Sequence, residues 1–197
     1  MDQLSQLKED FEWFRDACVK LRNLTNTYRE LYESGDETQQ LLRNSAGLFF
    51  DDLNQWLLEA YYLQAGRITD PAESMGNPNL TVEQITQQLQ QLGIITHEIQ
   101  VLSKNLKDYR KKIKEARNKI IAHADLGNIQ APKLLGTHTE EDAQSFLSNL
   151  NNFTDEVGIA LGIGPLDYSM QAGSGDVIDL LCLLRDCQKE QRINSND

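Results

Sequence analysis

The sequence predicts an all-α fold, an up-and-down bundle of long antiparallel helices. Apolar residues recur at steps of three and four over stretches of about 30 residues, as amphipathic helices require. No segment alternates apolar and polar residues with the period of two that marks a half-buried strand. Glycine and proline cluster between the periodic segments. We expect a single helical domain over residues 1–197, with its last helix as a C-terminal extension, and we expect the chain to form a homodimer.

The first two helices are expected at about residues 4–32 and 37–65. Ser34, Gly35 and Asp36 separate them, because a glycine readily ends a helix and an aspartate caps the next one. The residues expected to be buried in the first helix are Leu4, Leu7, Phe11, Phe14, Cys18, Leu21, Leu24, Tyr28 and Leu31. In the second helix they are Leu41, Leu42, Leu48, Phe49, Leu53, Trp56, Leu57, Ala60 and Tyr61.

A turn-rich stretch, residues 66–79, separates the second helix from a short third one. Thr81 followed by Gln84 is typical of a capping box, and we expect this third helix to end near Gly93. The remaining helices are expected at about residues 94–125, from the N-cap Thr139 to about Leu161, and at about 176–191. The residues expected on the buried stripe of the fourth helix are Leu102, Leu106, Tyr109, Ile113, Ala116, Ile120 and His123.

The net charge of −11 is distributed unevenly along the chain. Between Lys104 and Lys119, in the expected fourth helix, eight basic residues accompany two acidic ones. This segment therefore carries +6, and the rest of the chain must carry −17 to give the total of −11. Strong overall acidity argues against a general affinity for nucleic acid, whereas one basic helix suits a local anion site. The competing interpretation is that the run is a solvated helix face, as charged runs usually are.

Several classes of protein and site are excluded by what the sequence lacks. It has no stretch of about 18 consecutive apolar residues, and we therefore expect no membrane segment. It has no glycine-rich phosphate loop, nucleophile elbow or zinc-protease motif. The three cysteines, Cys18, Cys182 and Cys187, lack metal-ligand spacing, which predicts reduced thiols and a cytoplasmic location. We accordingly expect no metal and no other cofactor.

The most informative run is Arg117-Asn118-Lys119-Ile120-Ile121-Ala122-His123-Ala124-Asp125, at the end of the basic segment. A guanidinium binds phosphate through two parallel hydrogen bonds, and an imidazole transfers protons near neutral pH. On one straight helix, the six-residue spacing separates Arg117 from His123 by about 9 Å along the axis and about 120° around it. The two side chains therefore meet at one phosphate only through a local bend or across a two-fold interface between two chains. The competing interpretation makes His123 a buried, hydrogen-bonded core residue.

A second motif, Arg67-Ile68-Thr69-Asp70-Pro71, closes the expected second helix. An aspartate before a proline usually forms a turn, and an arginine in such a place usually pairs with a carbonyl or a surface acid. We therefore expect a structural role for this corner. The alternative is that it packs beside the end of the fourth helix and shapes the site there.

Together these motifs resemble the HEPN superfamily of small helical ribonucleases, in its abortive-infection AbiU-like branch. The resemblance covers about residues 10–165 and implies a single HEPN-like domain. It implies a metal-independent RNA endonuclease that acts as a homodimer, in phage defence or as a toxin paired with an antitoxin protein. The segments that carry it are the corner Arg67 to Pro71, the helix start Asn79-Leu80-Thr81-Val82, and the order Arg117-Asn118-Lys119 to Ala122-His123-Ala124-Asp125.

The resemblance implies a role for each residue of the motif. Arg117 would bind and neutralise the scissile phosphate, and His123 would act as general acid and base. Asn118, Lys119 and Asp125 would support them. Asp125 stands where relatives paired with a nucleotidyltransferase antitoxin have a modified tyrosine, so we do not expect that form of control here. The RNA-binding residues expected on the basic helix are Arg110, Lys111 and Lys114.

Two other functions remain open from the sequence. One is a non-catalytic helical module that binds RNA, a nucleotide or a partner protein through the same basic face. The other is a purely structural dimer, in which His123 is buried and Arg117 satisfies an internal carboxylate.

Overall fold

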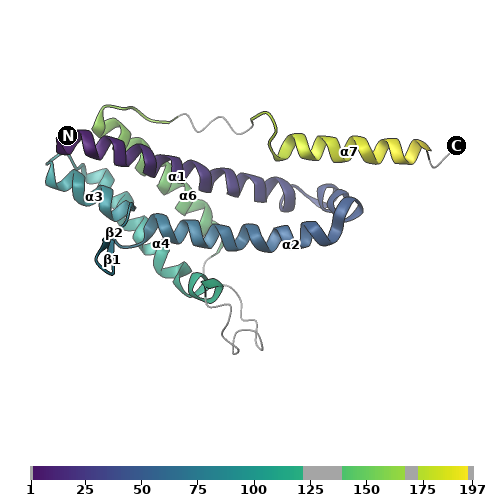
Figure 1. The fold of residues 1–197 in the computed structure, drawn as a ribbon, viewed down its shortest axis with the longest axis horizontal. Coiled ribbons are helices and arrows are strands. Elements are labelled where there is room, and N and C mark those ends of the chain that lie inside the picture. The colour runs from purple at the N-terminus through teal and green to yellow at the C-terminus, as the bar shows by residue number, and fades with distance from the viewer. Residues whose placement is uncertain (1, 122–138, 167–172, 195–197) are drawn as a thin grey trace. The chain divides into compact units, whose positions relative to one another are not determined.

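The computed structural model describes residues 2–121, 139–166 and 173–194. Within these residues the fold is an all-α bundle, as expected, accompanied by one very short β-hairpin (Figure 1). The elements in chain order are α1 (Gln3–Tyr32), α2 (Asp36–Thr69), β1 (Glu73–Ser74), β2 (Asn77–Pro78), α3 (Val82–Gln91), α4 (His97–Ile121), α6 (Glu140–Leu161) and α7 (Val177–Asn194). The chain divides into two compact units. Unit 1 comprises Met1–Leu21 and Tyr62–Asp167, and unit 2 comprises Arg22–Tyr61 and Tyr168–Asp197.

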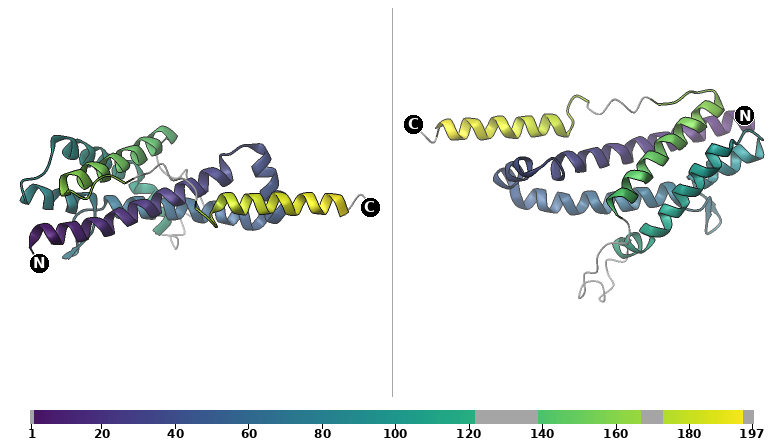
Figure 2. Two further views of the ribbon diagram at one scale, coloured as in Figure 1. Left: turned by 90° about the horizontal axis from the view of Figure 1, so that it is seen from above. Right: turned by 180° about the vertical axis from the view of Figure 1, so that it is seen from behind.

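Unit 1 has its core between the first half of α1, the end of α2, and helices α3, α4 and α6. Helix α4 packs most extensively along α6 and next along α3, and Figure 2 shows α4 and α6 side by side. Tyr109 of α4 stacks on Phe146 of α6 with ring centroids 4.3 Å apart, and Phe14 of α1 meets Phe153 edge-on at 6.0 Å. Burying each such aromatic side chain contributes roughly 1.5–3 kcal/mol to folding. The bundle around α4 is therefore well anchored.

The buried stripes expected for the first and fourth helices are largely confirmed. In α1 the fully buried members are Leu7, Phe11, Phe14, Cys18, Leu21 and Leu31, and in α4 they are Leu102, Leu106, Tyr109, Ile113 and Ala116. Leu24 and Tyr28 are half-buried, whereas Leu4 at the start of α1 is exposed. Ile120 belongs to α4, but its side chain lies outside the described residues, as does His123 altogether.

Side-chain caps set the start of three helices. Thr81 Oγ1 accepts the backbone N–H of Gln84 at 3.2 Å and begins α3, as expected. Thr139 and Asp142 form a reciprocal capping box that begins α6, where we expected an N-cap followed by acids. Helix α4 begins later than expected, at His97 rather than Ile94, because Thr96 Oγ1 accepts the N–H of Ile99 and caps it there.

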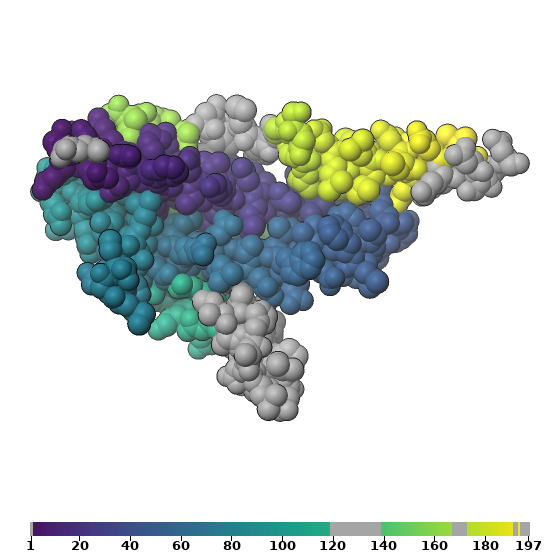
Figure 3. Space-filling model, in the orientation of Figure 1, coloured from purple at the N-terminus to yellow at the C-terminus, as the bar shows by residue number. Residues whose placement is uncertain are grey.

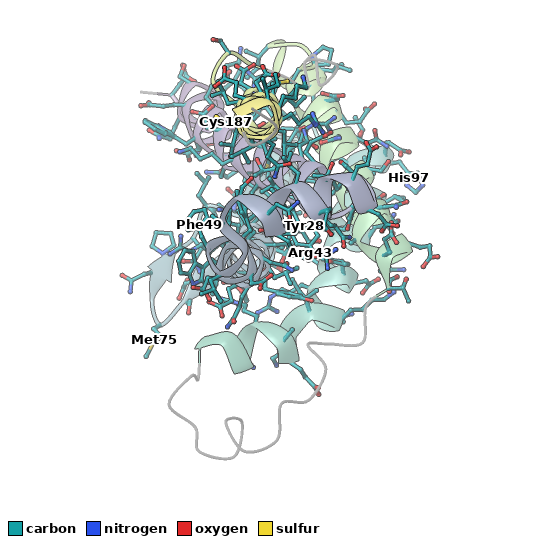
Figure 4. All side chains as sticks on the ribbon, turned by 90° about the vertical axis from the view of Figure 1, so that its right-hand side faces the viewer. Tyr28, Arg43, Phe49, Met75, His97 and Cys187 are labelled. Atoms are coloured by element: carbon teal, nitrogen blue, oxygen red, sulfur yellow. The ribbon has the colours of Figure 1, made fainter. Side chains whose placement is uncertain are left out.

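The β-hairpin between α2 and α3 was not expected from the sequence. Its strands have two residues each, which is too short for any alternation of apolar and polar residues to appear. Met75 and Gly76 at its turn both have positive φ, 53° and 80°, as the tightest hairpin turns require. Met75 at the tip is 99% exposed. Its side chain points away from the helices in Figure 4, and the hairpin lies at the lower left of Figure 3.

Unit 2 gathers the end of α1, the first part of α2 and helix α7 around a smaller core. The buried residues of this core are Leu31, Leu41, Leu42, Phe50 and Leu181. Tyr32 donates its hydroxyl hydrogen to the carbonyl of Phe50 at 2.6 Å, which ties α1 to α2. Gln188 of α7 donates to the carbonyl of Leu41 at 3.3 Å, which ties α7 to α2. Helix α7 extends three residues beyond the end expected for it.

The buried stripe expected for the second helix is partly wrong. Helix α2 is kinked at Ala46, whose backbone leaves the helical region with φ −158° and ψ 64°. This kink changes which face of the helix meets the core, and the periodicity counted from Leu41 loses its phase there. Leu48 and Phe49 are consequently exposed, while their neighbour Phe50 is buried. Trp56, farther along α2, is exposed as well.

Candidate functional site

Arg117 is held by Asp70 in a two-pronged ion pair. Nη1 of Arg117 donates to Oδ1 of Asp70 at 2.5 Å, and Nη2 donates to Oδ2 at 2.7 Å. Both side chains are mostly shielded from solvent, with 22% and 19% of their surfaces exposed. Charge-assisted pairs of this geometry are among the stronger hydrogen bonds in proteins and fix the plane of the guanidinium. The arginine of the sequence motif is therefore oriented by a carboxylate from the corner after α2.

A second arginine shares the same carboxylate. Nε of Arg110 donates to Oδ1 of Asp70 at 3.3 Å, and 29% of the Arg110 side chain is exposed. Arg110 and Arg117 are seven residues apart on α4, which places them on one face about 10.5 Å apart along the axis. We call Asp70, Arg110 and Arg117 the Asp70 cluster. Two guanidinium groups against one carboxylate give this cluster a net charge of +1.

The corner that carries Asp70 is fixed on both sides. Before it, the hydroxyl of Thr69 donates to the carbonyl of Ala65 at 2.7 Å, within the last turn of α2. After it, the amide of Asn79 donates to the carbonyl of Pro71 at 3.0 Å. The backbone N–H of Ala72 donates to a carboxylate oxygen of Glu83 in α3 at 2.9 Å. Asp70 is thus placed by a braced turn, which is what a positioning carboxylate needs.

Gly66 lets Arg117 pass close to helix α2. A Cβ added at Gly66 would lie 2.5 Å from Cδ of Arg117 and 2.7 Å from Nε, which is closer than real side chains come. Nε of Arg117 is buried there and has no hydrogen-bond acceptor within the part of the chain that the structure describes. A bulkier residue at this position would therefore displace the guanidinium.

The other expected site residues are distributed along α4. Lys111 is exposed and donates to Asp108 at 2.7 Å, and this hydrogen bond and charge lower the pKa of Asp108. Lys114 and Asn118 are exposed, and neither has a side-chain partner among the described residues. The side chain of Lys119 lies outside the described residues. His123 and Asp125 lie outside them as well.

Asp70 is a partner of Arg117 that the sequence analysis did not assign. The corner packs against α4 at both arginines, and these ion pairs are compatible with the expected structural role of the corner. The alternative reading of this corner, that it shapes the site, anticipated that contact. A structural role for Arg117 also anticipated an internal carboxylate, and Asp70 provides one. Arg67, in the same corner, is exposed and has no ion-pair partner among the described residues.

The described part of the chain also bears on other kinds of site. Within it, no three histidine, cysteine or acidic side chains lie together as a metal site would need. None of the described helices is long and apolar enough to cross a membrane. Cys18 is buried, which raises the pKa of its thiol, while Cys182 and Cys187 are exposed and none of the three forms a disulfide.

Comparison with known proteins identifies the family. The family model described as AbiU2, a HEPN family, matches residues 3–180, which is a longer stretch than the resemblance expected from the motifs. No curated protein and no solved structure matches the chain. The matched residues include α1 to α6, the Asp70 corner and the whole Arg117 to Asp125 run. This chain belongs to the AbiU2 family of HEPN proteins.

Proposed function

We propose that this protein is a metal-independent RNA endonuclease of the HEPN type, acting in abortive infection or as the toxin of a toxin–antitoxin pair. One observation carries the proposal: Arg117, in the most basic segment of the chain, is held in a fixed orientation within a cluster of net charge +1 and keeps 22% of its side chain exposed. Membership of the AbiU2 family supports it. Arg117 binds the scissile phosphate, and His123 is the general acid and base.

The chemistry needs little beyond these two groups, because RNA brings its own nucleophile. The imidazole of His123 takes the proton of the 2′-hydroxyl, and the freed oxygen bonds to phosphorus. The bond between phosphorus and the 5′-oxygen breaks, and that oxygen receives a proton from an imidazolium. Arg117 stabilises the charge that develops on the phosphoryl oxygens. The products are a 2′,3′-cyclic phosphate and a 5′-hydroxyl.

The proposed enzyme is a homodimer with a composite site. Six residues of regular helix would separate Arg117 and His123 by about 9 Å and turn them about 120° apart. A two-fold axis that places Arg117 of one protomer opposite His123 of its partner removes this separation. Asn118, Lys119 and Asp125 support the site.

RNA would approach along the basic face of α4. Arg110, Lys111 and Lys114 lie on this helix before Arg117, and Lys114 is exposed without a side-chain partner among the described residues. They would bind phosphates that flank the scissile one. Because phosphate binding releases counterions, RNA affinity should fall steeply as salt is raised.

The experiment is cleavage of RNA by the purified full-length protein, with and without a chelator. Wild type should produce 2′,3′-cyclic phosphate ends in both conditions, and Arg117→Ala or His123→Ala should lose at least about 100-fold in rate. His97→Ala is the matched control, because His97 is an exposed histidine at the start of the same helix. Unchanged cleavage in His123→Ala, or complete loss of activity with the chelator, would reject the proposal.

A second candidate function is a non-catalytic module that binds RNA, a nucleotide or a partner protein. The exposed basic side chains of Lys111 and Lys114 on α4 favour it, because they can bind an anion without a catalytic group. This candidate predicts RNA binding that weakens with salt and yields no cleaved product. Cyclic phosphate ends that appear only with the intact motif would eliminate it.

A further inference from the structure

We infer that Asp70 is a positioning residue for phosphate binding, which holds the guanidinium of Arg117 at the angle that a phosphate needs. The inference rests on the proposed function and deepens it. Asp70 touches no reacting atom, and it acts through Arg117. The geometry that carries this inference is the two-pronged pair at 2.5 and 2.7 Å. Asp70 is fixed in its turn by hydrogen bonds of its neighbours, and Arg117 is confined on its other side by Gly66.

The donors of Arg117 show what this arrangement leaves available. A guanidinium has five N–H groups, and the pair with Asp70 uses one on Nη1 and one on Nη2. The Nε–H is buried against Gly66. The remaining two are the second N–H groups of Nη1 and Nη2, on a side chain that is 22% exposed. These two N–H groups are the donors that a phosphate oxygen would use without displacing the carboxylate.

The charge balance explains why Asp70 does not cancel the site. Arg110 shares Oδ1 of the same carboxylate, so the cluster keeps a net charge of +1. Arg110 donates to Asp70 through Nε only, and its two terminal nitrogens have no partner among the described residues. Each arginine therefore presents terminal N–H groups while the single carboxylate restricts how both can rotate. The cluster is an oriented pair of cations rather than a neutralised one.

The alternative is that Asp70 competes with phosphate and restrains activity. The two ideas predict opposite changes in the rate of RNA cleavage for Asp70→Asn, a substitution that removes the negative charge and one of the two acceptor oxygens. If Asp70 positions Arg117, cleavage slows. If Asp70 competes, RNA binding and cleavage both improve. Glu115→Gln is the matched control, since Glu115 is an exposed acid on α4, two residues from Arg117, with no side-chain partner among the described residues.

The first test is a double-mutant cycle on single-turnover RNA cleavage by the full-length protein. Asp70→Asn should slow cleavage roughly 10–100-fold, because a displaced catalytic group costs about that much, while Glu115→Gln should not slow it. In an Arg117→Ala background, where Asp70 holds only Arg110, the further loss from Asp70→Asn should be much smaller than its effect in wild type. Equal rates for Asp70→Asn and Glu115→Gln, or an unchanged loss in the Arg117→Ala background, would overturn the inference.

A second measurement does not depend on cleavage. Nitrogen NMR of arginine side chains, assigned with Arg117→Lys, should show separate Nη1 and Nη2 signals for Arg117, because the two-pronged pair hinders rotation of the guanidinium. These signals should merge in Asp70→Asn. Asp70→Glu keeps the charge and should restore separate signals and part of the rate. If Asp70→Asn does not fold, the test rests on Asp70→Glu. Cleavage of RNA at the wild-type rate by Asp70→Glu would then count against a positioning role for Asp70.

Failure of the proposed function remains distinguishable from failure of this inference. If wild type cleaves no RNA, the nuclease proposal fails, and binding of a 2′-deoxy oligonucleotide, which lacks the nucleophile, decides about Asp70. Asp70→Asn should then bind this oligonucleotide roughly tenfold more weakly than Glu115→Gln, although both variants remove one negative charge. Equal or tighter binding by Asp70→Asn would overturn the inference.

Discussion

Gly66→Ala offers the sharpest test of how Arg117 is placed. Alanine normally stabilises a helix relative to glycine, by about 1 kcal/mol, and Gly66 lies in the last turn of α2 without a positive φ. The added methyl, however, would lie 2.5 Å from Cδ of Arg117 and 2.7 Å from Nε. The flexible side chain of an arginine could usually move away from such a methyl at little cost in free energy. Here, however, the guanidinium of Arg117 is held by both carboxylate oxygens of Asp70. Either the ion pair or the helix must shift.

The expected magnitude follows from these opposing effects. Overpacking costs about 1–3 kcal/mol, so Gly66→Ala should lower the free energy of unfolding by about 1 kcal/mol after the helix gain is subtracted. Gly47→Ala, in the same helix, is the matched control, because a Cβ there meets nothing within 4 Å. That variant should be neutral or stabilised by up to about 1 kcal/mol. The two variants should therefore differ by roughly 1–2 kcal/mol, or about 2–8 °C in melting temperature.

The assay is thermal unfolding followed by circular dichroism, together with RNA cleavage. In an Asp70→Asn background Arg117 is free to move, and Gly66→Ala should then become no more destabilising than Gly47→Ala. Cleavage should fall in Gly66→Ala and stay at the wild-type level in Gly47→Ala. Equal melting temperatures and equal cleavage for the two single variants would refute the argument that Gly66 provides necessary clearance for Arg117.

Three further predictions concern the scaffold. Burial raises the pKa of Tyr32 to about 12 from its usual value of 10, and the neutral hydroxyl donates to the carbonyl of Phe50. The stability that Tyr32 contributes should therefore be complete below pH 10 and be lost between pH 10 and 12. Melting curves of Tyr32→Phe, measured over this pH range, should lack this part of the alkaline decline. Gly158→Ala should lower the free energy of unfolding by about 2 kcal/mol in urea, because its methyl would collide with the backbone carbonyl of Gly164, whose N–H donates to the carbonyl of Gly158. Unchanged stability of this variant would contradict the close contact. Thr139→Ala should cost about 1 kcal/mol by the same measurement through loss of the α6 cap, and Thr139→Ser should recover most of it.

Local features of the fold could be predicted from the sequence. The caps at Thr81 and Thr139, and the stripe from Leu102 to Ala116, depend on residues within a few turns of one another. The phase of α2 was not predicted. The kink at Ala46 lies between Ser45 and Gly47, where the apolar stripe skips from Leu42 to Leu48, but these signals do not say which face is buried after the kink. Phe49 and Phe50 are adjacent and equally apolar, and only packing decides which of them is buried.

The candidate site shows a different limit. The motif residue Arg117 could be found from its neighbours in the sequence, since arginine and histidine in a basic helix indicate phosphate chemistry. Its partner Asp70 stands 47 residues earlier, and no local pattern reports a contact over that distance. An aspartate before a proline is also common in turns, so the presence of Asp70 before Pro71 does not indicate a contact with α4. The catalytic assignment of His123 and the dimeric state remain predictions.

The spacing of the two arginines on one carboxylate also constrains evolution of the helix that bears them. Arg110 and Arg117 are two turns apart, so their side chains converge only while the intervening stretch keeps its length. Inserting or deleting one residue between them would swing one guanidinium about 100° away from Asp70. Substitutions in this stretch should therefore be tolerated better than insertions or deletions, and a homologue of altered length here would need a different partner for one of its two arginines.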